Sequence, residues 1–293
     1  MPEGIIVKGI GGFYYVRTPE GIFECRARGL FRKKDIVPLP GDRVLFSIVD
    51  EVKKHGYIEN INKRSIELVR PAVANVSQVM VVLSVNSPDI DYMLLDKLLI
   101  TSEIKKANCL ICINKIDLDA KNEHKKFVDT YKNSGYEVIA ISAKEKQGID
   151  SLNKHLKNNI TVFAGQSGVG KSTILNRIID EYVMETGELS VKIDRGKHTT
   201  RHAELIELSG GGYIIDTPGF SSFELVNDIE CRDLEYYYRD FRKYLNSCKF
   251  TGCSHISEPT CMIKKAVEEG KIDKERYLRY IEIYKMLQKR KKY

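Results

Sequence analysis

The sequence lacks any apolar run near the ~20 residues that a helix needs to cross a bilayer. The longest apolar helical candidate, residues 92–100, is interrupted by the charged Asp96 and Lys97. The first ten residues lack a basic segment followed by an apolar one, so we expect no signal peptide. These absences argue against a secreted or membrane-spanning protein.

The sequence also lacks an even number of cysteines, so its cysteines cannot all pair with one another in disulfides. Seven cysteines and no expected signal peptide argue against a framework of disulfides and leave metal binding open. The chain contains no internal repeat and no low-complexity segment. Its 293 residues, 42% hydrophobic and 30% charged, are enough for two or three domains with sizeable cores.

The net charge of +7 is unevenly distributed. Residues 1–70 carry 13 Lys and Arg against 9 Asp and Glu, and residues 226–293 carry 16 against 11. The centre, residues 71–225, carries 18 against 20. Two basic flanks around a near-neutral centre favour contact of the flanks with a polyanion, although ordinary solvated surface explains the same counts.

Residues 4–62 have the pattern of short β-strands. Segments rich in β-branched and aromatic residues, with Gly or Pro between them, are 12–17, 21–28, 42–49 and 57–61. In the second segment, Phe23, Cys25 and Ala27 alternate with charged residues, as in a half-buried strand with a basic outer face. About five short strands in a segment of this length predict a small closed barrel of the OB type, and an SH3-like barrel has much the same pattern.

From Val79 onward, strand-like and helix-like segments alternate. The strand-like segments are 79–85, 109–113, 136–141 and 160–164, and the helix-like segments are 91–106, 120–133, 149–157 and one beginning near Lys171. This alternation predicts a mainly parallel sheet covered by helices on both faces. After a polar, loop-like span, residues 204–208 and 213–216 have the pattern of a β-hairpin joined by a serine and three glycines.

A phosphate-binding loop is predicted where the strand at 160–164 gives way to a helix. The pattern G-x-x-x-x-G-K-[ST] is matched by Gly165, Gln166, Ser167, Gly168, Val169, Gly170, Lys171 and Ser172, and we add Thr173 to this nucleotide-binding set. Lys171 is expected to reach the β- and γ-phosphate oxygens, and the Ser172 hydroxyl is expected to ligate Mg²⁺. The alternative is a glycine-rich turn that binds nothing.

A second phosphate-side motif, D-x-x-G, follows the strand at 213–216. Asp216 suits an outer-sphere contact to Mg²⁺, and the Gly219 N–H group can meet the γ-phosphate. Alone the motif is weak, but 45 residues beyond a phosphate-binding lysine it is strong.

A guanine site is predicted at the ends of two further strands. The pattern N-K-x-D is matched by Asn114, Lys115, Ile116 and Asp117. The Asp117 carboxylate can accept the N1–H and the exocyclic amine of guanine, and adenine offers neither in that geometry. A backbone N–H near Ser142 and Ala143 can meet the guanine O6. Taken by itself, N-K-x-D is also compatible with a helix cap.

Four metal-ligand residues lie within fourteen residues of the C-terminal flank. Cys248, Cys253, His255 and Cys261 supply three thiolates and one imidazole, a closed set that favours a tetrahedral, structural Zn²⁺. The spacing is not that of a common zinc finger, so scattered buried thiols are the alternative. Cys25, Cys109, Cys112 and Cys231 lie in apparent strands or helices and are interpreted as core residues.

The order of the nucleotide motifs is unusual. In ordinary GTPases the phosphate loop comes first, followed by the switch threonine, D-x-x-G, N-K-x-D and S-A. Here N-K-x-D and S-A precede the phosphate loop. The same sheet can form if the chain was re-cut, because the usual termini lie close together. The segment after Gly219 then leads directly into the C-terminal region.

In this order and its cysteine-rich ending, the sequence resembles the circularly permuted GTPases that assist late assembly of the small ribosomal subunit. The resemblance covers essentially the whole chain. It implies a cytoplasmic, monomeric enzyme that hydrolyses GTP to GDP and phosphate, with Mg²⁺ and one structural Zn²⁺. It further implies binding to the 30S subunit and its 16S rRNA, stimulation by that subunit, and no membrane partner.

The fold class expected is therefore α/β, with three domains. These are an all-β OB-like barrel at 1–68, a circularly permuted Ras-like P-loop GTPase domain at 69–226, and a zinc-binding, mainly helical module at 227–293. The barrel and the module are expected to contact RNA. Candidate contacts, each also compatible with a solvated charge, are Arg26, Arg28, Arg32, Lys33, Lys34, Lys289, Arg290, Lys291 and Lys292.

The group that orients the attacking water is not a glutamine here. The position after D-x-x-G, where Ras-like GTPases place that glutamine, is Phe220, which forms no hydrogen bond through its side chain. We expect slow intrinsic hydrolysis, with Thr200 ligating Mg²⁺ and His198 acting in catalysis beside Lys171. His202 is the next candidate, and the alternative for His198 is a plain polar loop residue.

Three other functions fit parts of the sequence. A P-loop kinase or transferase is disfavoured by the N-K-x-D motif and by the lack of an evident acceptor site. A module that holds GTP without meaningful hydrolysis would be separated by measuring phosphate release. A permuted GTPase of the large subunit would not need the front barrel together with the rear Cys3His set.

Overall fold

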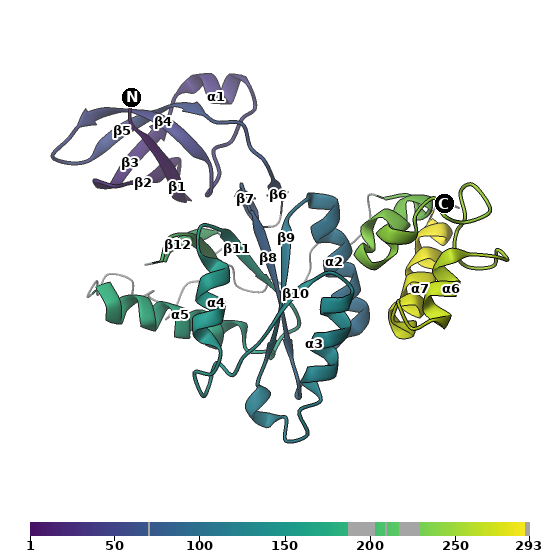
Figure 1. The fold of residues 1–293 in the computed structure, drawn as a ribbon. Helices are drawn as coiled ribbons and strands as arrows, with labels where there is room; N and C mark the ends of the chain where they lie inside the picture. Colours follow the sequence, from purple (N-terminus) through teal and green to yellow (C-terminus); the bar gives the residue numbers. More distant parts are fainter. Residues whose placement is uncertain (70, 187–202, 209, 217–228, 291–293) are drawn as a thin grey trace. The chain divides into compact units, whose positions relative to one another are not determined.

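The computed structural model describes residues 1–69, 71–186, 203–208, 210–216 and 229–290 (Figure 1). The chain forms two compact units. The first unit contains Met1–Val79, Ile149–Phe163 and the described residues of Ser172–Phe220. The second contains Met80–Gly148, Ala164–Lys171 and the described residues of Ser221–Tyr293.

The first unit begins with a closed five-stranded barrel. Its strands are β1 (Glu3–Ile10), β2 (Phe13–Thr18), β3 (Gly21–Ala27), β4 (Arg43–Asp50) and β5 (His55–Ile61), with the short helix α1 (Gly29–Lys33) after β3. Neighbours follow the order β1-β2-β3-β5-β4, and β4 pairs back onto β1. This circuit, in which only β3 and β5 run parallel, confirms the OB-like barrel and disfavours the SH3-like alternative.

The barrel core follows from the alternation predicted for its strands. Phe23 and Cys25 of β3 are buried, whereas Arg26, the residue directly after Cys25, is exposed. Phe23 also packs against Phe46 of β4, with ring centroids 5.1 Å apart. Burial of such side chains contributes about 1.5–3 kcal/mol each, which stabilises a barrel of this small size.

A second group of strands in the first unit continues from the barrel. Strand β12 (Glu204–Glu207) and strand β13 (Tyr213–Asp216) form the predicted antiparallel hairpin, and β13 runs parallel to β11 (Ile160–Ala164). Strand β12 pairs with β1 of the barrel, and there the Lys8 Nζ atom lies 2.9 Å from Glu204 Oε2. The unit is completed by helices α4 (Ile149–Leu156) and α5 (Lys171–Thr186) and by the small hairpin β6 (Glu67–Val69) and β7 (Ala72–Ala74).

The second unit contains the predicted strand and helix alternation. Strand β8 (Gln78–Ser84) leads to helix α2 (Tyr92–Lys105), then to strand β9 (Asn108–Asn114), the 3₁₀ helix η1 (Ile116–Leu118), helix α3 (His124–Asn133) and strand β10 (Glu137–Ala140). The strand order is β10-β9-β8, and β9 and β10 run parallel. Helix α2 starts where predicted because the Asp91 carboxylate accepts the Leu94 N–H at 2.8 Å.

The C-terminal module is built from two 3₁₀ helices and two α-helices. These are η3 (Cys231–Tyr237), η4 (Arg239–Tyr244), α6 (Met262–Glu268) and α7 (Lys274–Arg290). Its core surrounds Phe241 and Tyr280 and extends to Ile100 of α2. Arg276 of α7, only 1% exposed, contacts Asp96 of α2 and Asp240 of η4. Among the described residues, no helix is both long and apolar enough to cross a membrane.

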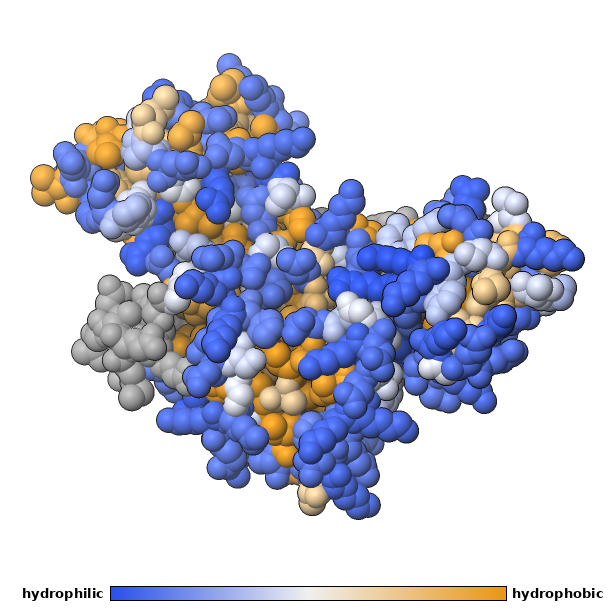
Figure 2. All heavy atoms as spheres, in the orientation of Figure 1, coloured by the Kyte–Doolittle hydropathy of each residue, from blue (hydrophilic) through white to orange (hydrophobic). Residues whose placement is uncertain are grey.

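The visible face of the molecule is dominated by hydrophilic residues, with smaller hydrophobic areas between them (Figure 2). Some apolar side chains on the barrel are nevertheless exposed, among them Val49 at 65% and Val52 at 95%. Scattered exposed apolar residues are ordinary on folded proteins, so they indicate no site by themselves.

Candidate functional site

The predicted phosphate loop lies between the buried strand β11 and the start of α5. A Cβ atom on Gly165 would lie 2.2 Å from the Val82 carbonyl oxygen, and φ at Gly165 is +134°. At Gly170, φ is +97° and a Cβ atom would lie 2.4 Å from Asn114 Nδ2. The loop backbone therefore approaches its neighbours more closely than any side chain allows, which explains glycine at both positions.

Lys171 lies at the first turn of α5 and turns back over the loop. Its Nζ donates to the carbonyl oxygens of Gly165 (2.7 Å) and Gln166 (2.6 Å). Partial burial lowers the pKa of this ammonium group from its ordinary value. The side chains of Ser172 and Thr173 are exposed at the same turn. A cation and hydroxyl groups at a helix N-terminus form a setting suited to phosphate and to an oxygen-preferring ion such as Mg²⁺.

Asn114 joins three of the predicted nucleotide segments. Its side chain is buried at the end of β9, Nδ2 donates to the Val169 carbonyl oxygen at 3.0 Å, and Oδ1 accepts the Ala143 N–H at 3.0 Å. The phosphate loop, N-K-x-D and S-A are thereby brought to one place. The Ala143 N–H, one of the backbone donors in the segment predicted to reach guanine O6, makes this contact in the structure.

Lys115 and Asp117 extend from the same strand end. Lys115 has φ +65°, and its Nζ donates to the carbonyl oxygens of Gly168 (2.8 Å) and Ser87 (2.6 Å). The Ser142 hydroxyl donates to Asp117 Oδ1 at 2.5 Å, and Ser142 is fully buried while Asp117 is exposed. An exposed carboxylate held by a buried hydroxyl is oriented to accept two N–H groups from a purine edge. The Ile116 N–H donates to the Ile141 carbonyl oxygen at 3.2 Å, which joins the loops through their backbones as well.

The loop after β8 is a part of this site that the sequence analysis missed. Its Ser87 carbonyl accepts from Lys115, and its Asp91 N–H donates to Gln166 Oε1 at 3.3 Å. The loop follows the carboxyl end of a buried strand, and ligand-binding loops of parallel sheets gather at such ends. In the sequence, the position of this loop directly after a strand-like segment was the feature that could have indicated its part in the site.

The other nucleotide residues are only partly described. Strand β13 ends at Asp216, as predicted, and its side chain lies outside the described residues. The predicted roles of Gly219, Phe220, His198, Thr200 and His202 also fall outside them. These assignments remain predictions.

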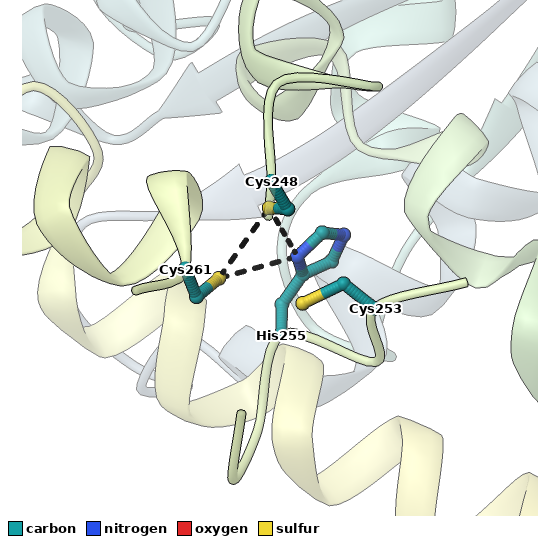
Figure 3. Close-up of side chains that lie close together, drawn as sticks. All are labelled: Cys248, Cys253, His255 and Cys261. Carbon is teal, nitrogen blue, oxygen red and sulfur yellow. Dashed lines mark hydrogen bonds between the residues drawn. The ribbon is translucent and has the colours of Figure 1, made fainter. Parts of the chain in front are cut away.

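The four metal-ligand residues converge in the C-terminal module (Figure 3). The ligand atoms of Cys248, Cys253, His255 and Cys261 all lie within 4.8 Å of one another. Cys248 Sγ is 3.8 Å from Cys261 Sγ and 3.6 Å from His255 Nδ1. A tetrahedral zinc ion with ordinary bond lengths requires about 3.8 Å between two sulfurs and about 3.6 Å between sulfur and nitrogen. Two of the separations therefore match a tetrahedral metal site, and the separation of 3.3 Å between His255 Nδ1 and Cys261 Sγ is slightly shorter.

The surroundings of the cluster are those of a structural centre. Three of the four ligand residues are buried, and the Met262 N–H points at Cys248 Sγ at 3.4 Å. Burial raises the pKa of the Cys253 thiol to about 12, and burial with the neighbouring Cys248 thiol raises that of Cys261. A divalent cation would offset this cost of ionising the thiols. Cys25, Cys109 and Cys112 are buried elsewhere, as expected of core residues.

The candidate RNA contacts differ in their surroundings. The Arg26 guanidinium lies 4.6 Å from the centre of the Phe13 ring, whereas Arg28 is paired with Glu59 at 2.5 Å. Lys33 and Lys34 are exposed at the end of α1, and Lys289 is exposed on α7. The Arg32 side chain and residues 291–292 are outside the part of the chain that the structure describes. A basic and aromatic surface therefore exists on the barrel, with part of its charge already neutralised.

Comparisons with known proteins agree with the nucleotide site and the Cys3His cluster described above. The family model described as RsgA GTPase matches residues 61–226, and the model described as RsgA N-terminal domain matches residues 3–58. A small ribosomal subunit biogenesis GTPase RsgA of Ruminiclostridium cellulolyticum is 58% identical, covering 98% of this chain and 94% of its own. Its counterpart in Clostridium perfringens is 50% identical, covering 95% and 96%.

Two solved structures are similar over nearly the whole chain. YjeQ from Thermotoga maritima has a TM-score of 0.83 at 35% identity, covering 98% of both chains. YloQ, described as a circularly permuted GTPase, has a TM-score of 0.84 at 38% identity, covering 99% of this chain and 96% of its own. These likenesses confirm the predicted fold class, a circularly permuted GTPase domain with a barrel before it and a Cys3His module behind it.

Proposed function

The chain belongs to the RsgA GTPase family, and we propose that it hydrolyses GTP to GDP and phosphate on the small ribosomal subunit during late assembly. The name shared by its curated relatives supports this partner. Hydrolysis then times release: the GTP form binds the subunit and the GDP form leaves it. We place this activity in the cytoplasm, with the protein acting as a monomer.

The main support is the contact made by Asn114. Because this one buried side chain bonds both the phosphate loop and the S-A segment, the guanine end and the phosphate end belong to one continuous site. A protein that only stored GTP would need the same loops. The membership in a family of GTP hydrolases decides between these two functions.

The mechanism assigns the phosphate and guanine contacts to described residues and one Mg²⁺ contact to Thr200, which lies outside them. Backbone N–H groups of 165–170 surround the phosphates, and the Lys171 ammonium exchanges its carbonyl partners for phosphate oxygens. Asp117, oriented by Ser142, selects guanine. Ser172 would hold Mg²⁺ together with Thr200, and this ion supplies positive charge beside the β- and γ-phosphates.

Two further features support the assignment of partners. The Cys3His set and its tetrahedral dimensions favour zinc as the structural metal. The basic flanks favour rRNA, with Arg26, Lys33 and Lys34 on the barrel and Lys289 on α7 as contacts. Replacing both Lys33 and Lys34 with Ala should weaken binding and lower its salt dependence, and Lys154→Ala, an exposed lysine on α4, is the control.

The direct test is phosphate release by the full chain alone, with 30S subunits and with 50S subunits. We expect stimulation by 30S only, and co-sedimentation with 30S in a non-hydrolysable GTP analogue but not in GDP. Lys171→Ala should abolish the stimulated rate. Equal stimulation by 50S subunits, or none by either, would contradict the proposal.

A further inference from the structure

Glu235 contacts the metal cluster from outside its ligand set. It lies on η3, the first helical element described after the D-x-x-G motif, twenty residues before His255. Its Oε2 atom is 2.5 Å from His255 Nε2, and the two side chains are 16% and 3% exposed. The pair is therefore shielded from water, where a charge-assisted hydrogen bond is strong.

The geometry fixes which histidine nitrogen faces the metal position. His255 Nδ1 lies 3.3 Å from Cys261 Sγ and 3.6 Å from Cys248 Sγ, and Nε2 points to Glu235. A carboxylate accepts a hydrogen bond, so Nε2 carries the hydrogen and Nδ1 keeps its lone pair for the ion. Carboxylates in this position orient metal-binding histidines and raise their basicity.

Other polar contacts hold the backbone of the metal loop. Glu258 accepts the backbone N–H groups of Ser254 (2.8 Å) and Ile256 (3.1 Å). The Tyr277 hydroxyl donates to the His255 carbonyl oxygen at 2.7 Å. These contacts shape the loop, and the contact from Glu235 acts on the imidazole ring itself.

We propose that Glu235 is a positioning residue of the metal centre and that the bound metal, through His255, holds η3 against the metal loop. The ion then stabilises two segments at once: the loop that supplies its ligands and η3, the first element described after the D-x-x-G region. Loss of Glu235 weakens metal binding and releases η3, while the four ligands remain in the chain.

The first test measures zinc affinity of the full chain by competition with a chromogenic chelator. Glu235→Ala should weaken zinc binding about 10–100-fold. Glu235→Gln should weaken it less, because an amide oxygen still accepts the Nε2–H but carries no charge. Asp233→Asn is the matched control, since Asp233 is on the same element with its side chain 45% exposed, and it should bind zinc as the wild type does.

The second test separates positioning from general support of the fold. In zinc-loaded Glu235→Ala, backbone amides of Cys231–Tyr237 should exchange with deuterium faster than in the wild type, while those of α6 keep their protection. Where Glu235→Ala does not fold, Glu235→Gln serves in both measurements. Zinc affinity within twofold of the wild type in the variant measured, or unchanged exchange in η3, would overturn the proposal.

Discussion

The nucleotide loops and the C-terminal module are both rich in polar contacts, but these contacts are of opposite kinds. In the nucleotide loops, Asn114 and Lys171 donate to backbone carbonyl groups of the phosphate loop. In the module, charged side chains meet one another out of water, as Arg276 does between Asp96 and Asp240. One region is held by exchangeable hydrogen bonds and the other by buried ion pairs and a metal-ligand set.

This difference shows how one chain combines an exchangeable site with a fixed arm. A typical hydrogen bond contributes only about 0.5–1.5 kcal/mol net, so the loop contacts are readily replaced by contacts to a nucleotide. Removing one partner of a buried ion pair costs about 3–5 kcal/mol, because the other charge stays buried, and we expect the module to stay joined to α2 in either nucleotide state. We therefore expect damage to one region to leave the other intact.

The largest difference between the effects on the two regions is expected from loss of a metal ligand. Cys253→Ser should lower zinc below one ion per chain and unfold the metal loop, because metal-binding energy there is folding energy. The affinity of the isolated protein for GTP should change less than twofold. Cys231→Ser, which alters a cysteine of the same module outside the cluster, is the control for metal content. A Cys253→Ser protein with stoichiometric zinc would contradict the ligand assignment.

The next largest effect is expected at the buried ion pairs. Arg276→Ala should lower the free energy of unfolding by about 3–5 kcal/mol, because it leaves Asp240 buried without its partner and Asp96 with only Arg279. Arg232→Ala is the matched control, since Arg232 pairs with Glu230 at 2.6 Å while 76% exposed, and it should change stability by less than about 1 kcal/mol. Urea denaturation of the zinc-loaded proteins measures both. Equal losses in the two variants would show that the buried ion pairs of the module stabilise it no more than an exposed pair does.

A smaller effect, confined to the nucleotide site, is expected from Asp117→Asn. Loss of a charged acceptor for two guanine N–H groups should weaken GTP binding by about 1.5–3 kcal/mol and permit binding of xanthosine triphosphate. Zinc content and stability should stay at the wild-type level. Fluorescent nucleotide titration gives the affinities, and a variant that binds GTP as tightly as the wild type would refute the role of Asp117.

The smallest effect is expected from Gly170→Ala. The new methyl group meets Asn114 Nδ2 at 2.4 Å in a backbone conformation that side chains disfavour, which should cost about 1–2 kcal/mol and weaken GTP binding. Gly210→Ala, where a Cβ atom has no neighbour within 4 Å, should leave GTP binding unchanged. Similar GTP affinities in the two variants would show that the tight approach at Gly170 is not required.

The sequence predicted best what depends on local pattern. Helix α2 spans Tyr92–Lys105 inside the predicted 91–106, because Asp91 caps its start and Lys106 ends it in a left-handed conformation. The 3₁₀ helices η3 and η4 were missed, because such short segments have no 3.6-residue period. Asp96 illustrates the limit: in the sequence it is a charge that interrupts an apolar run, and in the structure it is buried against Arg276, 180 residues away.

The candidate site likewise has a part that the sequence predicted and a part that it did not. Motif spacing predicted the convergence of the phosphate loop, N-K-x-D and S-A segments, and also the Cys3His cluster. It did not predict Ser87 or Glu235, because a backbone carbonyl contact and a carboxylate that orients a histidine follow no spacing rule. Such contacts depend on how segments distant in the sequence pack together.

The most direct test of the contrast is hydrogen–deuterium exchange of the zinc-loaded full chain with GDP and with a non-hydrolysable GTP analogue. We expect exchange to change in residues 114–118, 142–144 and 165–172 and to stay the same in α6, α7 and η4. A nucleotide-dependent change inside the C-terminal module, as large as that in the loops, would show that the module is not a fixed arm.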